Sequence, residues 1–270
     1  MNVIKKIYTD GFYGILDNLH ITDNAKFIFS PYKRLTRKFK DELVKVQRSS
    51  DFSSKWFGYD NNGDLETNSL LKWVGAGNDG LVEEVANQAN TIYNATQSNV
   101  SSKPKIVNSG DFQDDGLYFD GTDDNMSCVE YNEINILNPP ITIYTDSYLL
   151  NTSNPFAIIK GTDTSNVQYG MYFNYLLGSY IVISNNYPKV HDTIVNTRYK
   201  RLYAHDGVKV YGYMNRLYGE ASRINSSYAE KTGFYIGGVT SYLQKGNLKT
   251  IIIFNTNEIN QANYNGLSTI

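Results

Sequence analysis

The chain has 270 residues, and its 25 basic and 27 acidic side chains leave a formal net charge of -2 at pH 7. Such a balance creates no global field toward nucleic acid or an anionic membrane, so we expect neither as a partner. The single cysteine, Cys128, excludes an intrachain disulfide framework and a cysteine-rich zinc site. No apolar stretch approaches the roughly 20 residues that span a bilayer, and membrane insertion is not expected.

The aromatic content indicates the fold class. Aromatic residues make up 14% of the chain, including 23 Tyr and 12 Phe. Flat, half-buried rings pack well on a pleated surface and favour strands over helices. The N-terminal residues lack the apolar run of a signal peptide, which predicts a protein made in a cytoplasm. An all-β protein is therefore the expected class.

The first quarter of the chain is irregular. Residues 1–24 mix charge, glycine and scattered aromatics without a clean period, which predicts an N-terminal arm that contacts another chain. Within residues 25–50 the pattern favours a short helix followed by a strand that ends near Gln47. Residues 51–54 then form the expected turn.

Two further elements are expected before residue 125. Leu70, Leu71 and Val74 are spaced as on one face of a short helix, which Gly75 would end. Residues 116–121 predict a strand closed by a tight turn. The acidic residues after it, Asp123 and Asp124, are expected to shape that turn.

The second half shows strand candidates at regular intervals, a spacing typical of a sandwich or barrel. These candidates are residues 141–149, 156–160, 169–175, 180–184, 199–205, 208–214, 234–237 and 248–254. Asp206-Gly207 predicts a hairpin turn between two of them. After Phe254, Thr256 is expected to cap a last short helix. Because no linker divides the chain, residues 25–270 are predicted to form one domain.

Several segments taken together resemble a known family, the α-L-arabinofuranosidase B catalytic-domain-like proteins. They are Tyr32-Lys33-Arg34-Leu35, Val46-Gln47-Arg48-Ser49-Ser50-Asp51, Gly58-Tyr59-Asp60-Asn61-Asn62-Gly63-Asp64-Leu65, Trp73-Val74-Gly75-Ala76-Gly77, Asn94-Ala95-Thr96-Gln97, Lys103-Pro104-Lys105-Ile106-Val107 and Leu117-Tyr118-Phe119-Asp120-Gly121-Thr122-Asp123-Asp124. The later segments at residues 206–207, 234–238 and 246–254 are similar to laminin-G-like domains more broadly. The resemblance implies a concanavalin/laminin-G-like jelly-roll β-sandwich with short peripheral helices. It also implies a phage structural protein, because such sequences are common in phage structural genes.

The resemblance further implies where catalytic carboxylates would lie. The family's glutamate nucleophile aligns near Pro139 or Pro140, and its aspartic acid aligns with Val239 or Thr240. A retaining glycosidase needs two carboxyl groups, which these residues do not supply. The departure predicts that the chain is not an enzyme and has no catalytic residues. Asp146, Asp163 and Glu220 are the carboxylates that would revive a hydrolase function.

Other candidate sites are weaker. Asp60, Asn62 and Asp64 alternate oxygen ligands as in a calcium loop, but Leu71 stands where a calcium-binding EF-hand has glutamate, and an Asx-rich turn is the plainer interpretation. Trp56, in a charged and turn-rich context, is the aromatic side chain nominated for carbohydrate binding, whereas Trp73 is assigned to the core. No metal or other cofactor is predicted.

The sequence is compatible with three functions from different classes. The first is a non-catalytic virion component (fibre, head decoration or tail appendage), assembled in the host cytoplasm and held to other virion proteins by residues 1–24. The second is an adhesin that binds host surface glycans, and the third is a glycoside hydrolase. Since virion appendages gain avidity from repeated copies, a homo-oligomer is also predicted.

Overall fold

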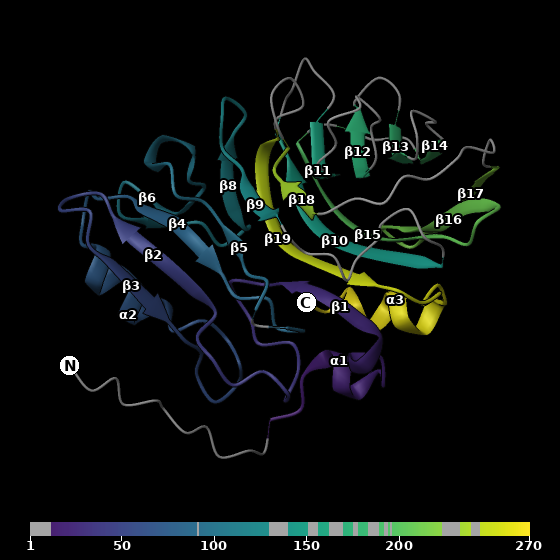
Figure 1. The fold of residues 1–270 in the computed structure, drawn as a ribbon, viewed down its shortest axis with the longest axis horizontal. Helices are drawn as coiled ribbons and strands as arrows, with labels where there is room; N and C mark the ends of the chain where they lie inside the picture. Colours follow the sequence, from purple (N-terminus) through teal and green to yellow (C-terminus); the bar gives the residue numbers. More distant parts are fainter. Residues whose placement is uncertain are drawn as a thin grey trace.

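The computed structural model describes residues 12–90, 92–129, 140–150, 156–161, 170–174, 178–182, 189–191, 194, 196–222, 233–238 and 244–270. Their 19 strands belong to one continuous antiparallel hydrogen-bonded sheet, which we describe as three parts that share edges and call sheet I, sheet II and the N-terminal sheet (Figure 1). Two of the sheets stack as a sandwich, and the third stands beside them. The all-β sandwich expected from the aromatic content and the strand spacing is therefore confirmed.

Sheet I is the lower layer of the sandwich in Figure 1. Its strands in spatial order are β1 (Ala25–Phe29), β19 (Lys245–Phe254), β10 (Ile141–Leu149), β15 (Thr197–His205), β16 (Lys209–Met214) and β17 (Leu217–Ser222). Between β15 and β16, the Asp206 carboxylate accepts the backbone N–H groups of Val208 and Lys209 at 2.8 Å each. Gly207 there has a φ of 104°, so the hairpin predicted at Asp206-Gly207 is confirmed.

Sheet II is the upper layer. Its strands in spatial order are β9 (Met126–Val129), β18 (Gly233–Ile236), β11 (Phe156–Gly161), β12 (Gly170–Asn174), β13 (Gly178–Val182) and β14 (Lys189–His191). Each of these pairs is antiparallel. The strand candidates in the second half of the sequence account for most strands of the two layers, whereas β9, β14 and β17 were not predicted.

The N-terminal sheet, at the left of Figure 1, contains β2 (Val44–Arg48), β3 (Ser54–Phe57), β4 (Gly80–Val85), β5 (Ala95–Thr96), β6 (Lys105–Asn108), β7 (Asp111–Phe112) and β8 (Leu117–Asp120). Strand β8 also pairs with β19, and β5 pairs with β9. These shared edges join the N-terminal sheet to both layers of the sandwich. One hydrophobic core runs through all three sheets, from Val46 and Phe57 to Ile251.

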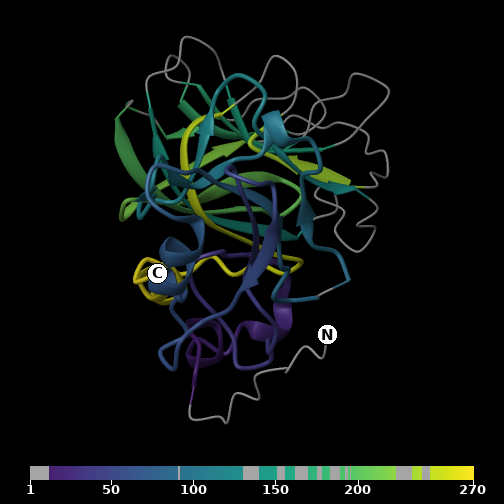
Figure 2. The ribbon, with the colours of Figure 1, turned by 90° about the vertical axis from the view of Figure 1, so that its left-hand side faces the viewer.

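The helices and short 3-10 turns cover the outside. They are α1 (Ile15–Asn18), η1 (Thr22–Asn24), α2 (Thr67–Val74), η2 (Val100–Ser102) and α3 (Gln261–Leu267). Figure 2 shows α1 and α3 below the sandwich. Helix α2 ends at Gly75, whose φ of 82° suits glycine, as predicted. In the part of the chain that the model describes, no helix is long and apolar enough to cross a bilayer.

Sheet I is buried on both faces. Ile251 and Ile253 of β19 face the core between the layers, whereas Ile252 and Phe254 face a second core formed with α1 and α3. Because successive strand residues point to opposite faces, burial of both faces explains the unbroken apolar run at residues 251–254. Leu16 and Ile21 also lie in the second core, so residues 15–24 pack on this chain's own sheet. The anchoring role of residues 1–24 stays a prediction.

Two local expectations are corrected. The helix expected at the start of residues 25–50 is strand β1, because Phe27 and Phe29 fill one core while Ile28 fills the other. The last helix begins after Asn260 rather than Thr256, since the Asn260 side chain accepts the backbone N–H of Asn263 at 2.7 Å. The Thr256 hydroxyl instead donates to Glu258 at 2.6 Å.

Candidate functional site

The positions expected to have lost the hydrolase carboxylates are mostly not described. Pro139, Val239 and Thr240 lie outside the described residues, as does Asp163. Pro140 is exposed at the start of β10. Glu220 is exposed on β17, where it accepts a hydrogen bond from Lys209 at 3.0 Å. At the positions that are not described, the expected loss of the hydrolase carboxylates therefore rests on the sequence alone.

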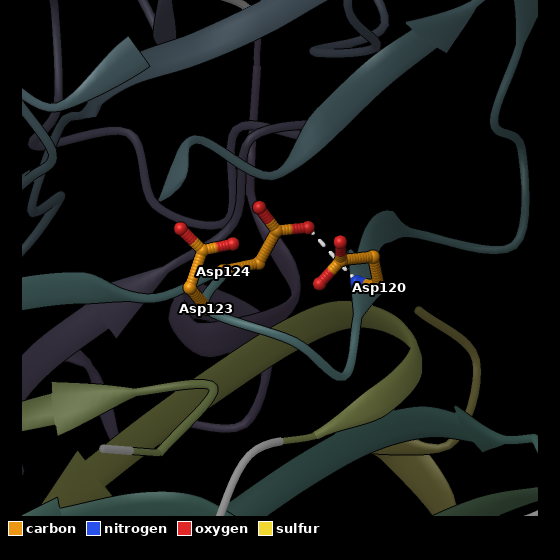
Figure 3. Close-up of side chains that lie close together, drawn as sticks. All are labelled: Asp120, Asp123 and Asp124. Atoms are coloured by element: carbon orange, nitrogen blue, oxygen red, sulfur yellow. Dashed lines mark hydrogen bonds between the residues drawn. The ribbon is translucent and has the colours of Figure 1, made fainter. Parts of the chain in front are cut away.

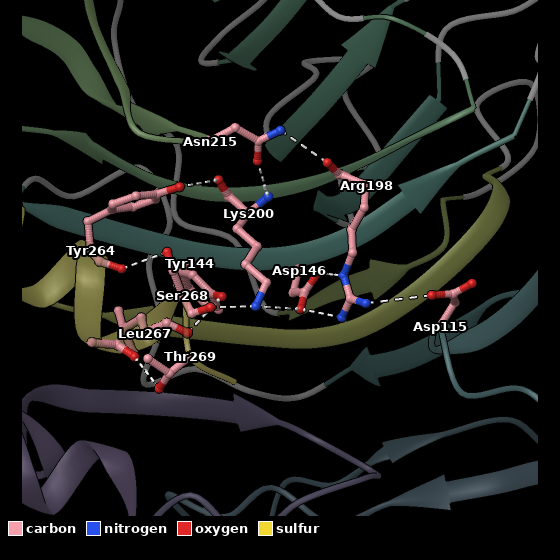
Figure 4. A network of polar contacts seen from close by, with 11 residues as sticks. Asp115, Tyr144, Asp146, Arg198, Lys200, Asn215, Tyr264, Leu267, Ser268 and Thr269 are labelled. Carbon is pink, nitrogen blue, oxygen red and sulfur yellow. Dashed lines mark hydrogen bonds and ion pairs between the residues drawn. The ribbon is translucent and has the colours of Figure 1, made fainter.

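Asp146 is the centre of a polar network on the outer face of sheet I (Figure 4). It is fully buried on β10, and Arg198 of β15 donates to both of its oxygens, from Nε and Nη2, at 2.8 Å each. Such a two-point contact fixes the carboxylate as well as neutralising it. With no exposed surface, Asp146 cannot reach a substrate, and its role is structural.

Further cations surround this carboxylate. Lys200 Nζ lies 3.7 Å from Asp146 and donates to the Ser268 carbonyl at 2.5 Å, which links sheet I to the end of α3. Arg198 Nη1 lies 3.5 Å from Asp115, in the loop before β8. Lys249 stands at a bulge where the register of β19 against β10 shifts. Burial, together with repulsion from Arg198, lowers the pKa of Lys200 and of Lys249.

A cavity of about 210 Å³ opens beside Lys249, where β1, α2, β7, β19 and the end of the α3 segment meet. We call it the junction pocket. Its charged lining consists of Lys33, Asp64, Asp114 and Lys249, and its hydroxyl lining of Ser30, Tyr32, Thr67 and Thr250. Leu65, Phe112 and Ile270 supply the apolar part. A mostly pre-formed cavity with a few convergent polar groups is the usual form of a small-molecule site.

Two contacts order this pocket. Lys33 Nζ and Asp64 Oδ1 form an ion pair of 2.9 Å. The rings of Tyr32 and Phe112 pack with centroids 5.5 Å apart at an angle of 59°. The pocket residues come from five separate stretches of the chain, and of its charged members only Asp64 stands out in the sequence.

Asp120, Asp123 and Asp124 form an acidic cluster in the turn after β8 (Figure 3). One carboxylate oxygen from each lies within 4.8 Å of the others. Asp124 accepts the backbone N–H of Asp120 at 2.8 Å, and Asp120 accepts that of Thr122 at 2.7 Å. Burial, followed by repulsion from Asp120 and Asp123, raises the pKa of Asp124 to about 7. The cluster therefore shapes the turn and could also hold a proton or a cation.

The weak calcium candidates also form a turn. The Asp60 carboxylate accepts the backbone N–H groups of Asn62 at 2.8 Å and of Asp64 at 3.0 Å. This is an Asx-type arrangement, which locks the loop by itself. The Asp64 carboxylate forms an ion pair with Lys33 and borders the junction pocket. Calcium binding at these residues stays a prediction.

The two tryptophans differ in their surroundings. Trp56 is half-buried on β3, opposite Lys45, and packs against the core. Trp73 also packs against the core, with its ring 5.4 Å from that of Phe57, but the Arg48 guanidinium lies 4.9 Å above it and its edge borders a shallow depression. Carbohydrate binding by Trp56 stays a prediction.

Neither the histidines nor Cys128 forms a nucleophilic site among the described residues. His191 stacks on Tyr203, and its Nδ1 lies 2.7 Å from the Tyr203 hydroxyl. His205 is fully buried between the layers. Cys128 is buried, and burial raises the pKa of its thiol, which therefore stays protonated and unreactive.

Neither a protein-family model nor a curated protein matches this chain, whereas solved structures do. A GH54 α-L-arabinofuranosidase variant soaked with 4-nitrophenyl α-L-arabinofuranoside has a TM-score of 0.66 at 13% identity, over 94% of this chain and 64% of its own. An arabinofuranosidase complexed with arabinofuranosyl-alpha-1,2-xylobiose has a TM-score of 0.65, also at 13% identity and with the same coverage. Trypanosoma rangeli sialidase in complex with sialic acid has a TM-score of 0.51 at 11% identity, over 69% of this chain and 31% of its own.

These comparisons correct one expectation. The chain was expected not to be an enzyme because hydrolase carboxylates are missing from the aligned positions, yet the structures it resembles over 94% of its length are glycoside hydrolases. The described residues do not show that catalytic carboxylates have been lost. This chain spans just under two thirds of the arabinofuranosidases and about a third of the sialidase. At these identities the likeness establishes the fold: an all-β sandwich of the type found in glycosidases.

Proposed function

We propose that this chain is a carbohydrate-active protein that acts on glycosides. The observation that carries the proposal is the sandwich fold, shared with arabinofuranosidases over 94% of this chain. The junction pocket supports it, because a cavity lined by hydroxyl and charged groups beside aromatic rings suits a saccharide better than an apolar ligand.

Asp64 and Asp114 are the first residues to test for a part in hydrolysis. Both are carboxylates that border the junction pocket. Glycoside hydrolysis commonly uses two carboxyl groups, one as acid and the other as nucleophile or base. Substituting either residue by asparagine keeps its size and removes that chemistry.

The decisive experiment is a panel of 4-nitrophenyl glycosides, with arabinofuranosides included, incubated with the purified chain. Release of 4-nitrophenol is expected for at least one glycoside, and it should fall by at least about a hundredfold in Asp114→Asn, the usual scale for a lost acid or base. Asp23→Asn, which removes an exposed carboxylate in η1 that does not border the junction pocket, is the matched control. Absence of release from every glycoside, together with absence of glycan binding at millimolar concentration, would overturn the proposal.

The host-attachment and virion roles are separate candidates that the sequence suggests. An adhesin needs a working saccharide site but no hydrolysis, and a glycan array with the purified chain tests it. For the virion role, mass spectrometry of purified phage particles is the direct test. The homo-oligomer is tested by light scattering, in which a monomer alone would count against it.

A further inference from the structure

A second hollow, which we call the basic depression, lies where α2 packs beside the β2–β3 hairpin (Figure 1). Its volume is about 390 Å³, and the residues that line it are Arg48, Lys55, Ser69, Lys72 and Trp73. Three of these five are cations, and no carboxylate is among the described residues of the lining. In a chain whose net charge is -2, such a local excess of positive charge favours an anionic ligand.

Helix α2 supplies one side of the basic depression. Ser69, Lys72 and Trp73 stand at positions i, i+3 and i+4, which lie on the same side of a helix. The Trp73 ring packs on Phe57 of β3, with centroids 5.4 Å apart. The indole is therefore fixed against the sheet, whereas Ser69 and Lys72 beside it are exposed.

Arg48, at the end of β2, forms a fixed wall next to the indole. Its Nη1 donates to the Trp73 carbonyl at 2.9 Å, and its guanidinium lies 4.9 Å from the centre of the Trp73 ring. Its Nε and Nη2 donate to the Asp51 carboxylate at 3.0 and 2.5 Å. Because Asp51 offsets the charge of Arg48, the net positive charge at the depression comes from Lys55 and Lys72.

These two lysines are free to bind a ligand. Both are exposed, and neither forms an ion pair or a hydrogen bond within the part of the chain that the structure describes. Lys55 Nζ lies 5.2 Å from the centre of the Phe57 ring, which holds it near the indole wall. Each ammonium group offers three hydrogen-bond donors, and the Ser69 hydroxyl can donate and accept. Such a set suits the oxygens of a carboxylate or a sulfate.

The size and the apolar wall favour an anion that carries a ring. A volume of about 390 Å³ lies within the usual range of small-molecule sites, about 300 to 1,000 Å³. The Trp73 indole offers apolar contact to one face of a ring. A bare inorganic anion would contact the ammonium groups alone and would leave the indole wall and most of the volume unused.

We propose that the basic depression binds an acidic sugar unit, carboxylated or sulfated. Lys55, Lys72 and Ser69 hold the anionic group, and the sugar ring lies against Trp73. The choice of a sugar as the ring rests on the proposed function. What is added is the acidic class of the saccharide and a second site. The basic depression shares no lining residue with the junction pocket, so binding here leaves that pocket free.

The test is calorimetric titration of the full chain at low salt with two matched pairs of ligands at millimolar concentration. One pair is methyl D-galacturonoside and methyl D-galactoside, and the other is N-acetylglucosamine 6-sulfate and N-acetylglucosamine. The acidic member of at least one pair is expected to bind about tenfold more tightly than its neutral partner. Added salt should weaken that binding. The pair that shows the difference identifies the anionic group as a carboxylate or a sulfate.

Charge-removing variants locate the binding. Lys55→Gln and Lys72→Gln are each expected to weaken binding of the acidic sugar about threefold to fivefold, the scale of one exposed ion pair. Lys72→Arg keeps the charge and should keep the affinity. Lys245→Gln, which removes an exposed lysine of β19 outside the depression, is the matched control. Because Lys55 and Lys72 are exposed, the melting temperatures of all variants should stay unchanged.

Three results would overturn the inference: equal affinity for the acidic and neutral members of both pairs, binding that neither glutamine variant weakens, or inorganic sulfate that binds as tightly as the acidic sugars. Failure of the proposed function looks different. Acidic-sugar binding that depends on Lys55 and Lys72, without hydrolysis of any glycoside, removes the enzymatic role and leaves the site. Hydrolysis of glycosides without acidic-sugar binding removes the site and leaves the enzymatic role.

Discussion

The Arg198 guanidinium donates two hydrogen bonds of 2.8 Å to the Asp146 carboxylate. The pair lies on the outer face of sheet I, whose other face lines the main core. The carboxylate has no exposed surface, and its hydrogen-bonded counter-charge is this one side chain, with Lys200 and Lys249 nearby. Removing the arginine would leave a buried charge without its main partner. The pair therefore joins β10 to β15, and its loss should lower the free energy of unfolding.

The first prediction follows from this pair. Arg198→Met should lower the free energy of unfolding by about 3 kcal/mol, because an unpaired buried carboxylate remains. The double variant with Asp146→Asn should recover a large part of the loss, since the stranded charge is gone. Denaturant unfolding measures both. Lys209→Met, which breaks an exposed pair with Glu220, should cost less than about 1 kcal/mol. Equal losses in the two single variants would contradict the role assigned to Asp146.

Asp124 should make stability depend on pH. Its pKa is about 7 in the folded chain and near the ordinary 3.8 in the unfolded chain. Between these values the folded state holds a proton that the unfolded state has released, so stability falls as pH rises from about 4 to 7 and levels off above. Asp124→Asn should flatten this decline and raise the melting temperature at pH 8. A decline of the same size in Asp124→Asn would show that other groups cause it.

The cap of the last helix can be located by substitution. Asn260→Ala should cost about 1 kcal/mol, because the first turn of α3 loses its side-chain acceptor for the Asn263 N–H. Thr256→Ala should cost less, since Thr256 lies outside the helix and makes its own bond to Glu258. Thermal unfolding of the two variants decides between the sites. A larger loss in Thr256→Ala would favour the cap first expected from the sequence.

Gly219 leaves room for His191. A methyl group there would lie 2.7 Å from the Val190 carbonyl oxygen and 2.9 Å from His191 Nε2. Gly219→Ala should therefore cost about 1 to 3 kcal/mol, the usual range for overpacking. It should also move the NMR signals of the His191 ring, which stacks on Tyr203. Unchanged His191 signals together with full stability would show that β14 and β17 separate easily.

The sandwich could be predicted from the sequence because its signals are local. Strand alternation and turn residues, such as Asp206-Gly207, act over a few positions. Strand β1 was missed for the opposite reason: Phe27 and Ile28 face two different cores, and the second core exists only once α1 and α3 pack below the sheet.

The candidate site was harder to predict. Asp146 stands out as a carboxylate in a strand, but the residue that neutralises it is 52 positions away. The junction pocket joins residues near 30, 64, 112, 250 and 270, and no spacing along the chain brings them together. That the hydroxyls of Tyr32 and Thr250 have no hydrogen-bond partner among the described residues is visible only in three dimensions.

Strand β19 pairs with β1, β8 and β10, all of which precede it in the chain. During synthesis these three strands therefore leave the ribosome before the strand that joins them, and their free edges stay open to wrong pairing. Since contacts so distant in sequence form slowly, the chain should fold late and all at once. A nascent chain stopped before residue 245 should therefore be sensitive to protease.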